Sequence, residues 1–222
     1  MSENAERRAA LQRERAAALA ERLDHWLQLG GDERALDVGT GAGAFAFAIA
    51  PRVREVVAVE LDESLAAQAR ADAPPNVEVI VADGENLPFE RASFDVAGTF
   101  RTLHHTQRPE LLVAELARVT RPGGTILVVD QIAPADPLVG LELSRFERAR
   151  DPSTTRVLAD ADLRGLFDSN GLTLVREEVL QEPRDLDAYL DLAGCEGEER
   201  ALARNLAKSG YDAVVGWFLL SR

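Results

Sequence analysis

An aspartate followed by three alternating glycines forms the stretch with the clearest chemistry, ALDVGTGAGAF at residues 35–45. An apolar run leads into Gly39, Gly41 and Gly43, and an alanine-rich apolar run follows, which is typical of a strand, a tight turn and a helix. The glycines fit the G-x-G-x-x-G/A pattern that cradles a pyrophosphate. Asp37, however, would repel a pyrophosphate at the end of the strand. A carboxylate there favours a ligand that carries an ammonium group.

A second acidic residue, Glu60, ends the apolar run EVVAVE, 21 residues after Gly39. An acid at this place can accept hydrogen bonds from both hydroxyls of an adenosine ribose, which NAD and S-adenosylmethionine share. Taken alone, Glu60 is better explained as a surface carboxylate at a strand end. Asp83, after the next apolar run, could accept from an adenine amino group. Together with Asp37 and the glycines, these acids favour S-adenosylmethionine, because it carries an ammonium group and a sulfonium.

Length and composition indicate a single globular enzyme domain. The chain has 222 residues, of which 46% are hydrophobic and 28% charged, as in ordinary globular proteins. No apolar run approaches the roughly 20 residues that span a bilayer, and the N-terminal segment is too charged for a secretory signal peptide. Cys195 is the single cysteine, so no internal disulfide can form. We therefore expect a cytoplasmic enzyme.

The net charge of −13 limits the possible partners. Nucleic-acid binders need positive surface to displace counterions from phosphates. The charge therefore argues against a DNA or RNA substrate, and equally against an anionic membrane surface.

Apolar segments alternate with helical ones along most of the chain. The pattern predicts a parallel, doubly wound α/β sheet, which binds ligands at the carboxyl ends of its strands. The expected strands are 34–39, 55–60, 77–82, 93–99, 125–130, 172–180 and 213–220, and the expected helices are 44–50, 63–72, 109–120, 136–150, 160–169, 185–193 and 198–208. A long helix over 4–29 either packs on the edge of the domain or forms a flap over the site.

Five motifs in order carry a resemblance to a known family. LDVGTGAG, VAVELDES, ADGENLPF, SFDVAGTFRTLHH and RVTRPGG cover about residues 34–130. In this order and spacing they resemble the class I S-adenosylmethionine-dependent methyltransferases. The similarity is greatest to the broad group of ubiquinone/menaquinone C-methyltransferases and small-molecule methyltransferases. Residues 147–175 resemble the region that follows the core in one bacterial subgroup.

The resemblance implies the architecture. It implies a seven-stranded Rossmann-like sheet whose last strand, 213–220, is antiparallel and lies beside the fifth. The whole chain, 1–222, would be one methyltransferase domain. Its parts would be an N-terminal helix over 1–30, a cofactor-binding core over 34–130, an acceptor lid over 131–155 and the C-terminal part of the sheet over 156–222.

The resemblance also implies the cofactor contacts. The glycine turn would hold the methionine end, Glu60 the ribose and Asp83 the adenine, while Leu61 would flank the adenine and Gly84 would allow its close approach. Many relatives have Asp where this chain has Glu60, and Glu reaches the same hydroxyls with one more methylene. The complete expected cofactor set is Asp37, Gly39, Thr40, Gly41, Gly43, Glu60, Leu61, Asp83, Gly84, Glu85 and Arg101.

The segment after the fourth expected strand, residues 100–106, should face the acceptor. His104 and His105 are the candidate catalytic residues, since an imidazole with a pKa near 6.5 can take a proton near neutrality. Alternatively, one ring packs under the next helix. Arg101 either binds an acidic acceptor or forms a salt bridge to a surface acid. The remaining histidine and the cysteine form no spacing typical of a metal site, so we expect no metal.

These residues support one leading function and two alternatives. The leading hypothesis is methyl transfer from S-adenosylmethionine to a small-molecule acceptor by in-line displacement. A non-catalytic S-adenosylmethionine-binding module is the first alternative. An NAD-dependent oxidoreductase is the second, and Asp37 and the RVTRPGG motif argue against it.

Overall fold

A single mixed sheet with helices on both faces forms the body of the protein. The computed structural model describes residues 18–207 and 212–222. The strand order is β3-β2-β1-β4-β5-β8-β7, and the short β6 pairs in parallel with the end of β5. The strands are β1 (Arg34–Val38), β2 (Glu55–Glu60), β3 (Val77–Val81), β4 (Phe94–Phe100), β5 (Thr120–Ala133), β6 (Leu158–Ala159), β7 (Thr173–Pro183) and β8 (Asp212–Ser221).

The predicted fold class is confirmed. Strands β1 to β5 are mutually parallel. The last strand, β8, lies between β5 and β7 and is antiparallel to both, as expected for its place beside the fifth strand. Within the described residues, the two-residue β6 is the one addition to the seven expected strands.

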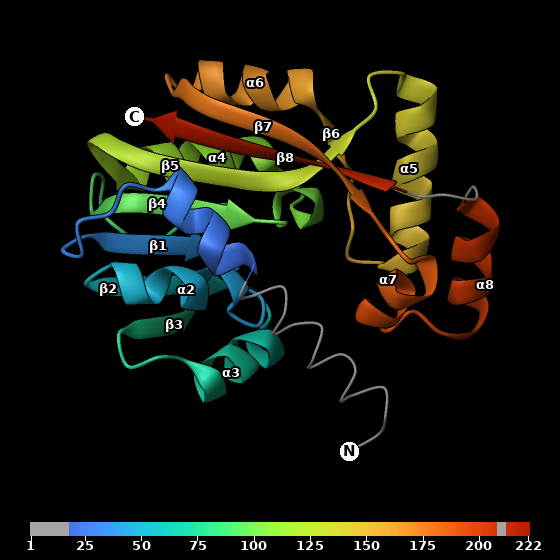
Figure 1. Cartoon of the computed structure of the whole chain (residues 1–222), viewed down its shortest axis with the longest axis horizontal. Coiled ribbons are helices and arrows are strands. Elements are labelled where there is room, and N and C mark those ends of the chain that lie inside the picture. Colours follow the sequence, from blue (N-terminus) through green and yellow to red (C-terminus); the bar gives the residue numbers. More distant parts are fainter. Residues whose placement is uncertain (1–17, 208–211) are drawn as a thin grey trace.

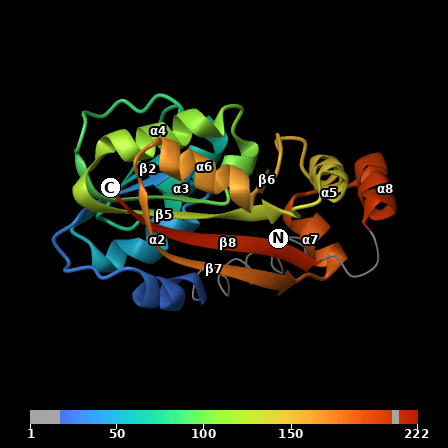
Figure 2. The same ribbon diagram turned by 90° about the horizontal axis from the view of Figure 1, so that it is seen from above.

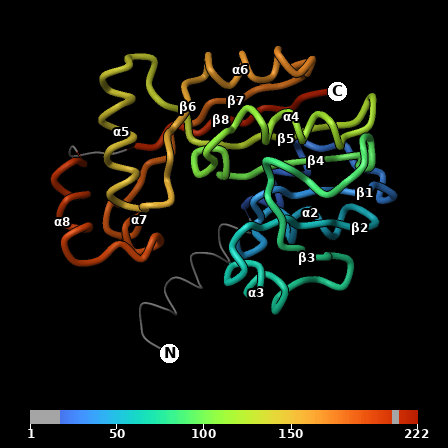
Figure 3. Tube along the Cα trace, turned by 180° about the vertical axis from the view of Figure 1, so that it is seen from behind, coloured from blue at the N-terminus to red at the C-terminus, as the bar shows by residue number. Residues whose placement is uncertain are grey.

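The helices cover the two faces of the sheet and one of its ends. They are α2 (Ala44–Ile49), α3 (Glu63–Asp72), α4 (Pro109–Val119), α5 (Pro137–Arg150), α6 (Asp160–Ser169), α7 (Leu186–Leu192) and α8 (Gly197–Leu206), with 3-10 turns η1 (Ala50–Arg52) and η2 (Leu103–His105). Figure 2 shows α4 and α6 on one face and α2 on the other. Helices α5, α7 and α8 lie beyond the carboxyl ends of the parallel strands (Figures 1 and 3). Within the described residues, no helix is long and apolar enough to cross a membrane.

Alternation along the strands divides the core into two layers, because successive side chains of a strand point to opposite faces. Ala35, Val56 and Leu127 pack with α2, α3 and the N-terminal helix. Their neighbours in sequence pack with α4 and α6 on the other face: Leu36, Val57 and Val128.

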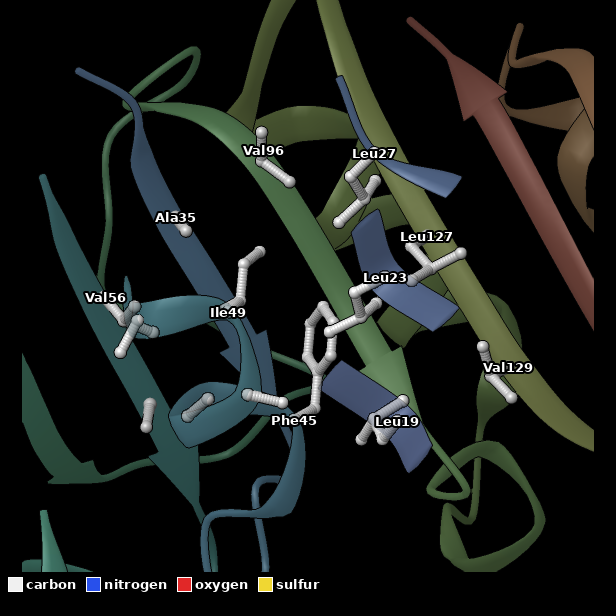
Figure 4. Packing of buried hydrophobic residues seen from close by; sticks show 14 of the residues in the cluster. Leu19, Leu23, Leu27, Ala35, Phe45, Ile49, Val56, Val96, Leu127 and Val129 are labelled. Carbon is white, nitrogen blue, oxygen red and sulfur yellow. The ribbon is translucent and has the colours of Figure 1, made fainter. Parts of the chain in front are cut away.

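The described part of the N-terminal helix, residues 18–26, packs on the first of these layers. Leu19, Leu23 and Leu27 lie against Phe45 and the β5 side chains (Figure 4). The ring of Trp26 lies 5.4 Å from that of Trp217 in β8. This part of the helix is therefore a packed element of the domain rather than a flap. Residues 4–17 of the predicted helix lie outside the described residues.

The fifth strand differs from its predicted extent at both ends. It begins at Thr120 and continues to Ala133, whereas the sequence predicts 125–130. Gly123 adopts a φ of 73°, and its N–H donates to the carbonyl of Arg222, so the glycine-rich start of the strand pairs irregularly instead of forming a loop. The far end extends because β6 and β8 both pair with it.

The predicted lid segment, 131–155, is joined by two helices from further along the chain. It contains the end of β5 and helix α5, and α5 shares a small separate core with α7 and α8. That core contains Phe146, Tyr189, Leu190, Cys195 and Ala203. The cover over the carboxyl ends of the strands is therefore a three-helix cluster.

The packing of the N-terminal helix gives a stability prediction. Leu23 is 0% exposed, so Leu23→Ala should lower the free energy of unfolding by about 2–5 kcal/mol through lost burial and a cavity. Urea unfolding of the two proteins measures this difference. Glu21→Ala on the exposed side of the same helix should change it by less than about 0.5 kcal/mol. Equal effects of the two substitutions would show that the helix is not docked.

Candidate functional site

The glycine turn between β1 and α2 is the centre of the candidate site. Gly39, Gly41 and Gly43 have φ values of 75°, 56° and 95°, a region that side chains other than glycine rarely adopt. A Cβ on Gly39 would collide with the Thr102 side chain, and one on Gly43 with the Phe47 ring. Around Gly41 the space is open. The outer glycines allow close packing, and the middle one leaves bare backbone for a ligand.

Asp37 is a fully buried carboxylate beside this turn. Its Oδ2 accepts a hydrogen bond of 3.0 Å from the N–H of Ala46, while Oδ1 is buried without a hydrogen-bond partner. Burial raises the pKa of Asp37 to about 7 against the lowering effects of the Thr40 hydroxyl and the Ala46 N–H, and the Glu60 charge adds the smallest contribution, which raises it. A buried carboxylate with one vacant oxygen suits a cationic group, so the residues present fit the ammonium of a methionine moiety.

Glu60 lies against the turn from the end of β2. Its Oε2 accepts from the N–H of Gly41 at 2.8 Å, and its Oε1 accepts from the N–H groups of Leu61 and Asp62. Each carboxylate oxygen has a further lone pair, so ribose hydroxyls can still donate to it. Leu61, the residue after Glu60, is 68% exposed, so a flat apolar group can pack against its side chain.

The segment after β3 contains three of the predicted cofactor contacts, Asp83, Gly84 and Glu85, and each has a different environment. Asp83 Oδ1 accepts from the N–H of Glu85 at 2.8 Å. A Cβ on Gly84 would come within 2.6 Å of the Val38 side chain, so the close approach at this glycine is to β1. Among the described residues the second carboxylate oxygen of Asp83 accepts no hydrogen bond, and Gly84 sets the distance between the loop and the sheet.

Both carboxylate oxygens of Glu85 bind Arg108, the residue just before α4. Its two oxygens accept from the backbone N–H and the Nε of Arg108, at 2.9 and 2.8 Å. Burial would raise the pKa of Glu85, but these contacts with Arg108 lower it overall. The sequence could not identify this pairing, because the two residues lie 23 positions apart.

Arg101, at the end of β4, adopts the salt-bridge alternative. Its Nη2 lies 2.6 and 2.9 Å from the two carboxylate oxygens of Glu182 in β7. The next residue, Thr102, donates its hydroxyl to the carbonyl of Gly39 at 3.0 Å. Thr102, two residues after β4, therefore contacts the glycine turn, and Arg101 lies beside it in the chain.

His104 forms a buried pair with a residue that the sequence did not identify. Its Nδ1 lies 2.5 Å from Oδ1 of Asp130 in β5, and both side chains are less than a tenth exposed. Burial would raise the pKa of Asp130, but the contact with His104 lowers it overall. An Nδ1–H that donates to the carboxylate leaves Nε2 as the acceptor nitrogen. The signal for Asp130 is its place after the apolar run TILVV, at the carboxyl end of a strand.

His105 has a different environment from its neighbour. Its Nδ1 lies 2.9 Å from the Ser153 hydroxyl, which in turn donates to Asp151 at 2.6 Å. Burial and the neighbouring His104 lower the pKa of His105. The two rings are 4.1 Å apart, and His105 links them to the segment after α5.

The site therefore combines a ligand cradle with an acid–base pair at one edge of the sheet. The cradle consists of Asp37, the glycine turn and Glu60, and the pair is His104 with Asp130. Glu85 and Arg101 are bound to other side chains. Among residues 18–207 and 212–222, no group of three or more His, Cys, Asp or Glu side chains is placed to hold a metal ion.

Comparison with known sequences gives the family. Residues 36–128 match the family model described as a methyltransferase domain. The uncharacterized methyltransferase YcgJ of Bacillus subtilis is 31% identical over 167 residues, covering 73% of this chain and 66% of that protein. The demethylmenaquinone methyltransferase of Clavibacter sepedonicus is 31% identical over 129 residues, covering 57% of this chain and 53% of that protein. The chain thus spans about half to two thirds of these relatives' own length.

Solved structures share the fold. The crystal structure of YcgJ superposes with a TM-score of 0.83 at 22% identity, covering 94% of this chain and 97% of that one. A putative methyltransferase from Bacillus halodurans gives 0.81 at 25% identity, covering 91% and 97%. A geranyl diphosphate methyltransferase in complex with S-adenosylmethionine gives 0.68 at 17% identity, covering 93% and 85%. The cradle fits this cofactor, and the chain belongs to the class I S-adenosylmethionine-dependent methyltransferases.

Proposed function

We propose that the protein transfers the methyl group of S-adenosylmethionine to a small-molecule acceptor by in-line displacement, with His104 as the general base. The observation that carries the proposal is the buried His104–Asp130 pair, which lies after β4 and near the end of β5, two strands that follow β1 and its glycine turn in the sheet order. A module that only binds the cofactor has no need for an oriented base at this edge. The family membership leaves the NAD-dependent oxidoreductase without support.

The cradle residues would hold and orient the cofactor. Asp37 would pair with the ammonium, the backbone around Gly41 would face the methionine portion, and Glu60 would accept from the ribose. The cofactor itself supplies an electrophilic methyl group on a positively charged sulfur. What remains for the protein is to fix the geometry and to exclude water, because an in-line substitution needs the nucleophile close to the methyl carbon.

His104 would remove the proton that the acceptor loses. Asp130 holds the ring by Nδ1 at 2.5 Å, which fixes the tautomer and stabilises the imidazolium that forms. The same division of roles is found where a carboxylate orients a catalytic histidine. A hydroxyl or amine acceptor would gain from such a base, since its own proton is weakly acidic.

A half-open cavity of about 230 Å³ at the end of β5 is a candidate space for part of a small acceptor, and neither the cradle residues nor His104 is among its described lining residues. It begins at Gln131, the residue after Asp130, and its walls include Leu143 and Phe146 of α5. Two other leucines of α5, Leu138 and Leu141, are exposed. A small organic molecule fits a mainly apolar space of this kind. A nucleic acid does not fit it, and the net charge of −13 argues against one as well.

Ligand binding and turnover together test the proposal. Calorimetry should show that S-adenosylhomocysteine binds and that NAD(H) does not. With methyl-labelled S-adenosylmethionine and a metabolite library, label should pass to at least one small acceptor. Binding of S-adenosylhomocysteine without any transfer would instead support the non-catalytic module, and binding of NAD(H) alone would contradict both.

The buried Asp37 makes cofactor affinity depend on pH. Its pKa is raised from 3.8 to about 7, so much of the free protein is protonated at pH 6, while pairing with an ammonium needs the ionised form. Affinity for S-adenosylhomocysteine should therefore rise about tenfold between pH 6 and pH 8. The raised pKa of Asp37 also predicts that the ligand-free protein loses stability as pH rises from about 4 to about 7, because the folded chain binds this proton more tightly than the unfolded chain does.

Asp37→Asn is the control for this dependence. The variant should bind S-adenosylhomocysteine more weakly, with an affinity that is nearly constant between pH 6 and pH 8. Calorimetry at matched ionic strength measures both proteins. If the variant keeps the full pH dependence of the wild type, the titrating group is a different residue.

The catalytic pair gives a kinetic prediction. His104→Ala should lower kcat by about 100-fold or more, with little change in affinity for S-adenosylhomocysteine. Asp130→Asn should also lower kcat, because it disturbs the tautomer of the ring. His25→Ala removes an exposed histidine elsewhere and should leave kcat unchanged. Full turnover in the His104 variant would assign that ring to packing.

A further inference from the structure

The side chain of Arg184, between β7 and α7, is a buried cation whose positive charge is only partly balanced by a nearby carboxylate. It is 5% exposed, and its Nη2 lies 3.4 Å from Oε2 of Glu182, a long contact for an ion pair. Its Nε and Nη1 are buried and have no hydrogen-bond partner among residues 18–207 and 212–222. Burying a guanidinium in this way is costly unless a partner binds it.

Among the described residues, the other side chains that contact Arg184 bring no further negative charge to it. Its guanidinium stacks on the Tyr189 ring at 4.1 Å, and that of Arg150 stacks on the same ring at 4.3 Å. Glu147, the nearest buried acid, pairs with Arg150 at 2.7 Å and accepts from the Tyr189 hydroxyl. Burial raises the pKa of Tyr189 to about 12, so this ring is neutral. The acid in the cluster is therefore matched by Arg150.

Glu182 is shared between two arginines. It contacts Arg101 at 2.6 and 2.9 Å, much more closely than it contacts Arg184. Two guanidinium groups thus face one carboxylate, which leaves one positive charge in excess. In a chain with a net charge of −13, an excess buried cation at this place is unusual.

The two arginines extend from the lid helices to the cofactor turn. Arg184 lies two residues before α7, which packs with α5 and α8 beyond the carboxyl ends of the strands (Figures 1 and 3). Arg101 immediately precedes Thr102, whose hydroxyl donates to the carbonyl of Gly39. A group bound between Arg184 and Arg101 would therefore lie between the lid and the methyl donor.

We propose, on the basis of the methyl transfer proposed above, that the acceptor carries an oxyanion, a carboxylate or a phosphate, and that Arg184 and Arg101 bind it. Glu182 orients the two arginines and competes with the acceptor for them. Arginine suits this role because its planar donors match carboxylate and phosphate oxygens. A neutral acceptor would leave the excess charge of Arg184 unmet.

Thermal shift with simple anions tests the arginine site directly. In saturating S-adenosylhomocysteine and at constant ionic strength, the wild type is titrated with benzoate, phenylacetate and inorganic phosphate, and with benzamide and phenylacetamide as neutral counterparts. At least one anion should raise the melting temperature, and the amides should not. Absence of any response to the anions would overturn the proposal.

Three variants separate anion binding from a structural role. Arg184→Met should weaken the response about 10- to 100-fold in concentration, the range for lost charge-assisted hydrogen bonds. Glu182→Gln should strengthen it several-fold, because the competing carboxylate is gone, and a purely structural Arg184 predicts no such gain. The surface variant Arg164→Gln, which also removes one arginine charge, should respond as the wild type does. An equal response in Arg184→Met, or a weaker one in Glu182→Gln, would contradict the proposal.

The response to S-adenosylhomocysteine distinguishes a failure of the proposed methyl transfer from a failure of the proposed anion site. If it stabilises the wild type and Arg164→Gln but not a folded Arg184→Met, the anion bound by Arg184 is the cofactor's own carboxylate, and the inference fails. If S-adenosylhomocysteine stabilises none of the proteins, the proposed methyl transfer fails. The anion titrations can then be repeated without S-adenosylhomocysteine, and they still test anion binding by Arg184. Acceptors found in the library screen should be anionic at the assay pH, and acceptors that are all neutral would overturn the inference.

Discussion

The backbone of the turn at residues 39–43 is the constraint on which the rest of the site depends. The N–H groups of Gly39 and Thr40 donate to the carbonyl of Val59 at 2.8 and 3.0 Å, and that of Gly41 donates to Glu60. The turn is thus attached to the end of β2, while Thr102 attaches it to the end of β4. Because β1 lies between β2 and β4 in the sheet, one turn fixes three strand ends relative to each other. Any side chain at Gly39 would break this arrangement.

Unmet charge is concentrated at the same edge of the sheet. Asp37 is buried with a vacant oxygen, and Arg184 is buried with two vacant nitrogens. Elsewhere, buried charges such as Glu147 and Arg150 are paired at 2.7 Å. A fold optimised only for stability would pair or remove the first two, since an unpaired buried charge costs several kcal/mol. The two proposals assign ligands of opposite charge to these groups, an ammonium to Asp37 and an oxyanion to Arg184.

The sequence was sufficient to predict the sheet because its signals are local. Apolar runs such as 55–60 predict buried parallel strands, and the glycines predict the turn. It also placed Asp37, Glu60 and His104 at strand ends, since chain order alone determines which ends meet in a parallel sheet.

The partners of these residues could not be predicted in the same way, because they depend on packing between distant segments. Asp130 lies 26 positions from His104, Glu182 lies 81 from Arg101, and Arg108 lies 23 from Glu85. A carboxylate or guanidinium in the sequence carries no mark of its counterion. The sequence therefore predicted residues at the edge of the sheet, and only the structure distinguished those that remain available to a ligand from those that are already paired.

The end of β5 connects the base to the lid. Adjacent residues of a strand point to opposite faces, and here Asp130 contacts His104 while Gln131 donates to Glu147 of α5 at 2.9 Å. Glu147 in turn holds Arg150 and the Tyr189 hydroxyl, and the Tyr189 ring is stacked on Arg184. The position of the base and the position of the arginine cluster are therefore set by two consecutive residues of one rigid strand. An acceptor held at one end by the arginines and deprotonated at the other by His104 would thus meet a fixed distance between the two groups, which is how a site of this kind selects acceptors by length as well as by charge.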